Sequence, residues 1–73
     1  MTLKRYTFSW LATSTKVKGV SGGRISVTAC TYEIAKYQAE REVRTNEIDW
    51  MLEVADQNEI DIHLSLEKAV EIE

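Results

Sequence analysis

Apolar and polar residues alternate along residues 5–13, with the period of a half-buried strand. The apolar set fills every even position of that stretch: Tyr6, Phe8, Trp10 and Ala12. A similar alternation returns in residues 24–29, after the glycine-rich segment 19–23. Glycine clusters between two such stretches are typical of a turn. The pattern therefore predicts a long first hairpin with its apolar side chains on one face.

From Tyr32 the spacing of the apolar residues changes to that of a helix. Thr31 is a favourable N-cap residue, and Asn46 is able to end a helix in the left-handed conformation. One stripe of this segment is apolar and contains two alanines: Tyr32, Ala35, Ala39 and Val43. Small side chains let a helix backbone come close to a sheet. We therefore expect one helix, packed on the hairpin through this stripe.

The opposite stripe of the helix carries Ile34, Tyr37 and Arg41, spaced three and four residues apart. A solvated stripe would normally carry Lys, Glu and Gln. Scattered apolar residues are common on protein surfaces, so an ordinary solvated face is one interpretation. Tyr and Arg are enriched where proteins bind each other, so a partner-binding surface is the other.

Residues 48–55 also alternate, with apolar side chains at every even position. A helical spacing would group Ile48, Met51, Leu52 and Ala55, but Trp, Val and Ile favour a strand. Residues 56–59 have the composition of a turn, and residues 60–67 alternate again. Val70 and Ile72 keep the even phase, so the tail either prolongs this last strand or forms a short fifth strand. A helical turn over residues 66–70 is the alternative.

These elements predict an α+β fold of the order ββαββ, with an antiparallel sheet of four or five strands and one helix packed on one face. Residues 1–73 are expected to form a single domain with a thin core. The expected core is Tyr6, Phe8, Trp10, Ile25, Val27, Ala35, Ala39, Val43, Ile48, Trp50, Leu52, Val54, Ile60, Ile62, Leu64 and Leu66. The other sheet face is expected to be solvated. Its exceptions, Leu11 and Met51, are candidates for a dimer or partner contact.

Charge is distributed unevenly along the chain. Residues 1–32 carry five basic residues and no acid, whereas residues 33–73 carry all 12 acids and four basic residues, so +5 and −8 give the net charge of −3. Either the surface is dipolar and steers partners, or the two segments are neighbours and offset each other. The single cysteine, Cys30, excludes an internal disulfide and favours a cytoplasmic protein. No apolar run is long enough to predict a membrane span.

Candidate chemistry is sparse. The glycine-rich segment 19–23 lacks the Lys-Ser/Thr ending of a phosphate-binding loop, but the flanking Lys16, Lys18 and Arg24 are candidate phosphate contacts. An ordinary glycine turn is the alternative interpretation. His63 has no Cys or His at metal-ligand spacing, and no nucleophile–base pair is visible. We therefore expect no metal, no cofactor and no enzymatic activity.

The stretch ISVTACTYEIAKYQAEREV combines a strand, an Ala-x-Thr junction and an Ala-x3-Ala helix. It resembles the middle of many small phage and mobile-element proteins, and the layout of most of the chain is similar to that of some anti-CRISPR proteins. This resemblance is one of layout and transfers no functional residue. It implies a compact, non-enzymatic protein that blocks or redirects a host complex by surface contact.

The first functional hypothesis is therefore an inhibitor that binds a host protein or ribonucleoprotein complex, of the anti-CRISPR or another anti-defence type. Its candidate partner-binding residues are Ile34, Tyr37, Arg41, Asp49, Met51, Glu53 and Asp61. Acids of the second half could meet a basic, nucleic-acid-binding groove of the partner: Glu47, Asp49, Glu53, Asp61 and Glu67. The alternatives are a nucleic-acid-binding protein that uses the basic hairpin, and a small dimeric regulatory protein.

Overall fold

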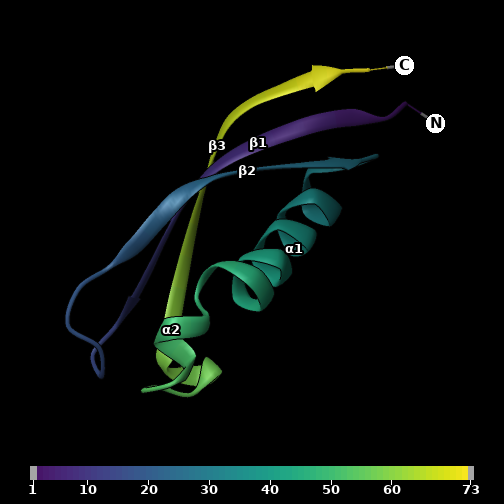
Figure 1. Cartoon of the computed structure of the whole chain (residues 1–73). Coiled ribbons are helices and arrows are strands. Elements are labelled where there is room, and N and C mark those ends of the chain that lie inside the picture. The colour runs from purple at the N-terminus through teal and green to yellow at the C-terminus, as the bar shows by residue number, and fades with distance from the viewer. Residues whose placement is uncertain (1, 73) are drawn as a thin grey trace.

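The computed structural model describes residues 2–72 as one sheet covered on one face by helical segments (Figure 1). The strands are β1 (Lys4–Ser14), β2 (Ser21–Ala29) and β3 (Ile60–Glu71). Between β2 and β3 lie α1 (Tyr32–Glu42), the π-helical turn η1 (Val43–Glu47), α2 (Asp49–Leu52) and the 3-10 turn η2 (Gln57–Glu59). The α+β class and the first hairpin are as the sequence predicts. No helix within the described residues has the length and apolarity to cross a membrane.

The sheet is antiparallel, in the order β2-β1-β3. Phe8 of β1 lies opposite Ile25 on β2 and opposite Leu66 on β3, so these three side chains share the face toward α1. A register shift between Thr7 and Phe8 leaves Glu67 as an extra residue in β3, a β-bulge. The tail therefore prolongs the last strand, but its side chains beyond the bulge change faces.

The sequence-based prediction of four or five strands is wrong, because the described residues form three. Residues 48–55, expected as a strand, instead contain the short helix α2 and a turn. The expected burial of that segment changes accordingly. Trp50 is 44% exposed and Val54 64% exposed, whereas Met51, expected on the open sheet face, is 0% exposed. The order ββαββ is replaced by ββαβ with short helical turns before the last strand.

The path of α1 explains why no further strand is needed. Ala29 at the end of β2 lies beside Lys4 of β1, which pairs with Glu71 of β3 at the same end of the sheet. From there α1 runs to the other end, where Ser14 pairs with Ile60 at the start of β3 (Figure 1). Strands β2 and β3 are therefore parallel to each other, and such strands are joined by a crossover, usually a helix. The helix α1 alone carries the chain back to the end of the sheet where β3 begins. Residues 43–59 therefore form turns that lead into β3 rather than another strand.

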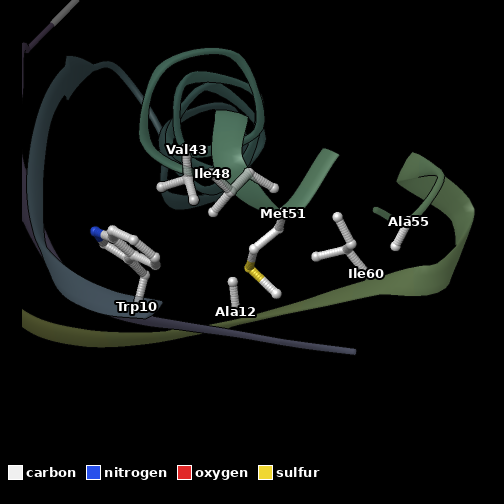
Figure 2. Close-up of a cluster of buried hydrophobic side chains, with 7 residues drawn as sticks. All are labelled: Trp10, Ala12, Val43, Ile48, Met51, Ala55 and Ile60. Carbon is white, nitrogen blue, oxygen red and sulfur yellow. The ribbon is translucent and has the colours of Figure 1, made fainter. Parts of the chain in front are cut away.

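The core has two clusters on the helix side of the sheet. The first lies under α1 and consists of Tyr6, Phe8, Val27, Ala29, Ala35 and Ala39. The second lies under η1 and α2 and consists of Trp10, Ala12, Val43, Ile48, Met51, Ala55 and Ile60 (Figure 2). Ile25 and Leu64 pack against both clusters. In Figure 2 the Met51 side chain extends toward Ala12, between Trp10 and Ile60. The second cluster thus closes the end of the sheet that α1 does not cover.

The start of α1 is as the sequence predicts, whereas its end differs from the prediction. Thr31 accepts a hydrogen bond on Oγ1 from the backbone N–H of Ile34 at 3.3 Å, which confirms it as the N-cap. Asn46 does not end the helix in the left-handed conformation, since no non-glycine residue of the described chain has positive φ. The helix instead widens into η1, where the Thr45 hydroxyl donates to the Arg41 carbonyl oxygen at 2.8 Å.

Candidate protein-binding surface

The side of α1 that faces away from the sheet carries Ile34, Tyr37 and Arg41, which we call the outer face of α1. Ala35 and Ala39 are buried against the sheet, which directs this stripe outward. Ile34 is 48% exposed and Tyr37 66% exposed. Arg41 is exposed and takes part in no ion pair between described residues. These residues lie on one exposed surface, as the helical spacing predicts.

Three hollows border the outer face of α1. The first, of about 330 Å³, is lined by Tyr32, Glu33, Lys36, Tyr37 and Glu40. The second, of about 320 Å³, is lined by Tyr37, Glu40, Arg41, Arg44, Thr45 and Gln57. The third, of about 320 Å³, is lined by Gln38, Arg41, Glu42, Thr45 and Asn46. Tyr37 and Arg41 each line two of them. Tyr37 and Arg41 therefore separate neighbouring hollows. Side chains of a partner could fill these hollows.

Charged residues surround this surface. Glu33, Lys36 and Glu40 stand beside Tyr37 around the same hollow. An apolar or aromatic centre with a polar rim is the usual composition of a protein interface. These rim residues are not among the partner-binding residues that the sequence predicts. Their signal is the helical spacing of three and four residues between positions 33, 36, 37 and 40.

The acidic part of the predicted partner surface does not form one face. Asp49 is exposed on α2 and Glu53 is exposed just after it, whereas Asp61 lies on β3, opposite Thr13. Met51 is buried in the core and is therefore removed from the candidate contact residues. The sequence-based prediction placed Asp49, Met51, Glu53 and Asp61 on one sheet face because it treated residues 48–55 as a strand.

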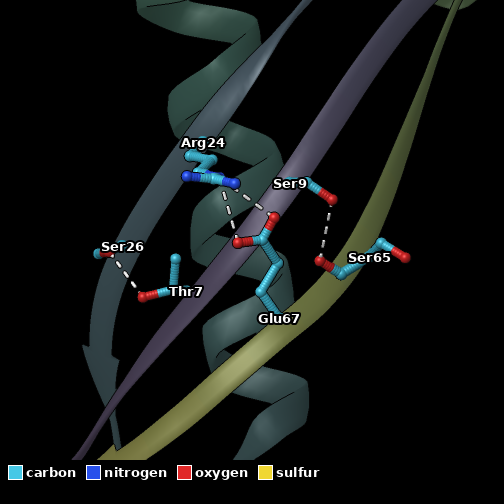
Figure 3. Close-up of polar contacts among 6 residues, drawn as sticks. All are labelled: Thr7, Ser9, Arg24, Ser26, Ser65 and Glu67. Atoms are coloured by element: carbon cyan, nitrogen blue, oxygen red, sulfur yellow. Dashed lines mark hydrogen bonds and ion pairs between the residues drawn. The ribbon is translucent and has the colours of Figure 1, made fainter.

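Two of the three candidate phosphate contacts of the first hairpin, Lys16 and Arg24, lie close to acids of the second half of the chain. Lys16 Nζ is 3.5 Å from Glu59 Oε2, and Arg24 Nε is 3.1 Å from Glu67 Oε1 (Figure 3). Lys18 is exposed and makes no ion pair within residues 2–72. Exposed pairs of this kind contribute about 0–1 kcal/mol to stability, but they reduce the positive potential that a phosphate would meet. The structure thus favours the interpretation in which the two charged segments offset each other.

The open face of the sheet is polar, as expected for a solvated face. Thr7 and Ser26 bridge β1 and β2 through their hydroxyl oxygens, 2.9 Å apart, and Ser9 Oγ donates to the Ser65 carbonyl oxygen at 3.5 Å (Figure 3). Leu11 is 42% exposed on this face, as predicted. These contacts tie β1 to both of its neighbouring strands.

Among the described residues no three His, Cys, Asp or Glu side chains are grouped as metal ligands would be. Comparison with protein-family models, with curated proteins and with solved structures finds no match for this chain.

Proposed function

We propose that this chain is a small protein-binding protein and that the outer face of α1 is its contact surface. The observation that carries the proposal is the exposure of Tyr37 beside Arg41 on a helix face that packs against nothing in the sheet. Tyr and Arg are among the residues that contribute most binding energy when they are buried at an interface. Hollows on either side of them supply the shape for an interlocking partner.

The size of the surface limits the kind of contact. The 11 residues of α1 extend over about 16 Å at 1.5 Å per residue. A standard interface buries about 800 Å² on each partner, which is wider than one short helix face. The contact would therefore include Tyr32 at one end and Gln57 at the other, since these residues line the bordering hollows.

We propose a host protein or ribonucleoprotein complex as the partner, which binding would inhibit or redirect. The resemblance in layout to small phage and mobile-element proteins supports this class. The net charge of −3 that remains after the two charged segments offset each other supports a basic partner surface, because complementary potentials accelerate association. The basic hairpin is not proposed as a nucleic-acid site, because Lys16 and Arg24 face carboxylates.

Site-specific photo-crosslinking tests the contact surface. A photoreactive phenylalanine analogue replaces Tyr37 in one version of the protein and Thr28, exposed on β2, in a second version. Both are irradiated in a lysate of the cells that naturally produce the chain, and captured proteins are compared by mass spectrometry. We expect one protein or complex to be captured from position 37 and not from position 28. Equal capture from both positions would contradict the proposal.

The purified partner then gives the energetics. Tyr37→Ala and Arg41→Ala are each expected to weaken its affinity at least about tenfold, the cost of truncating a central contact residue. Val54→Ala is the matched control, because Val54 is similarly exposed, at 64%, but lines none of the three hollows that border the outer face of α1. Circular dichroism would verify that each variant keeps its helix. Unchanged affinity in both α1 variants would refute the assignment of this face.

A further inference from the structure

The outer edge of β3 has no neighbouring strand within the described residues, because the strand order ends there (Figure 1). Ile72 donates its N–H to the Leu3 carbonyl oxygen at 3.1 Å, so its backbone faces β1. The Ser65 carbonyl oxygen also faces β1, where it accepts from Ser9. Backbone groups alternate in direction along an antiparallel strand. Because the bulge at Glu67 shifts this alternation by one residue, the residues whose N–H and C=O groups point outward are Ile62, Leu64 and Leu66 before the bulge and Ala69 and Glu71 beyond it.

The geometry points to a homodimer in which the β3 edges of two copies pair antiparallel about Leu64. A two-fold axis at Leu64 places Leu64 opposite Leu64 of the second copy. It also places Ile62 of each copy opposite Leu66 of the other. Each of these pairs would exchange two backbone hydrogen bonds, because all three residues present outward backbone groups. Leu66, 44% exposed on the helix side, would then pack against Ile62 of the second copy. The two sheets would join into one of six strands, three from each copy.

The charged residues along the outer edge of β3 identify a second copy of the chain as the partner strand. In this register Asp61 of one copy lies opposite the bulge residue Glu67 of the other, with Lys68 next to it on the same sheet face. The Glu67 carboxylate is already directed across β1 to Arg24, at 3.1 Å (Figure 3). Neither Asp61 nor Lys68 forms an ion pair with a described residue. The two-fold axis therefore brings two unused opposite charges together, twice, as a self-complementary interface requires.

The start of β3 limits the paired stretch. Arg44 donates to the carbonyl oxygens of Ile60 and Gln57, at 3.3 and 3.0 Å, and so occupies the edge before residue 61. A lysine and a bulge ordinarily protect an exposed edge from indiscriminate pairing. Here Lys68 and the bulge at Glu67 end the paired stretch on the other side. The available edge thus fits a short partner strand of matching length and charge, which β3 itself provides. This inference is independent of the outer face of α1.

Charge reversal tests the register by sedimentation equilibrium over micromolar to millimolar concentrations. The wild-type chain is expected to dimerise, and Lys68→Asp to raise the dissociation constant at least about tenfold, since two attractive pairs become repulsive. The double variant Asp61→Lys with Lys68→Asp is expected to restore dimerisation. Lys18→Asp makes the same charge change at an exposed residue of the first turn and is expected to leave it unchanged.

Disulfide trapping tests the position of the axis, in a Cys30→Ser background. Mixing a His63→Cys chain with a Ser65→Cys chain is expected to give a mixed disulfide, because this pair would lie about 4.5 Å apart at Cα. Thr28→Cys, on the same face of β2, is the matched control and is expected to cross-link with neither. A chain that stays monomeric, or a dimer insensitive to both tests, would overturn the proposal.

Discussion

Replacing Met51 with alanine is predicted to remove about 3 kcal/mol of unfolding free energy. Met51 is 0% exposed and packs in the cluster with Ala12, Val43 and Ile60. Truncation of such a side chain loses its transfer free energy and leaves a cavity, at a cost of about 2–5 kcal/mol. A chain of 73 residues has roughly 4–11 kcal/mol of stability in total. This one substitution would therefore remove a large share of it.

The neighbours of Met51 provide the matched comparison. Trp50 is 44% exposed and Val54 64% exposed, so solvent fills the space when either is truncated. We expect a cost of about 0.8–1.5 kcal/mol for Trp50→Ala, half the roughly 1.5–3 kcal/mol for fully burying a large apolar side chain, and a change within about 0.5 kcal/mol for Val54→Ala. Met51→Leu keeps the volume and is expected to cost less than about 1.5 kcal/mol.

Urea denaturation followed by far-ultraviolet circular dichroism measures all four variants against the wild-type chain. Circular dichroism is preferred because Trp50→Ala changes the fluorescence signal itself. If residues 48–55 alternated as a strand, Trp50 and Val54 would be the costly positions and Met51 the tolerant one. An observed order of that kind would refute the packing of α2 described above.

Two further substitutions test how the helical segments are attached. Thr31→Ala removes the acceptor for the Ile34 N–H and is expected to cost about 1 kcal/mol, whereas Thr31→Ser should keep most of the stability; urea midpoints of the two variants would show the difference. Arg44→Ala removes two charge-assisted hydrogen bonds, to Gln57 and Ile60, and is expected to cost about 1.5–3 kcal/mol by the same measurement. Arg44→Lys should recover little, because a single ammonium does not reproduce the two-nitrogen geometry; full recovery would contradict this role.

The first half of the fold could be predicted from the sequence because each local signal agreed with the others. The even residues Tyr6, Phe8 and Trp10 alternate without interruption and are buried, as expected. Thr31 caps α1 and Ala35 contacts the sheet, again as expected. A change of period from two to 3.6 at a good N-cap leaves only one consistent arrangement.

The prediction for residues 48–55 was wrong because the same residues fit both the period of a strand and the period of a helix. Ile48, Met51 and Ala55 have helical spacing and pack in the same core cluster, yet the alternation of Trp50 and Val54 with acids also fits a strand. The outcome was decided by topology: α1 already returns the chain to the start of β3. A local pattern carries no information on where a helix ends relative to the sheet. The predicted position of the acidic contact residues was wrong because it depended on this segment being a strand. The prediction of the outer face of α1 depended only on helical spacing.

The central position of β1 has a consequence for the order in which the chain folds. Strand β1 can pair with β2 through a short turn, but its other edge is completed only by β3, whose Leu66 lies opposite Phe8. Closing such a distant contact loses more chain entropy than forming the hairpin, and non-local pairing slows folding. During synthesis the hairpin and α1 would therefore be complete while Trp10 still lacks Leu64 beside it. The second core cluster can assemble only once Ile60 and the strand that follows have been made.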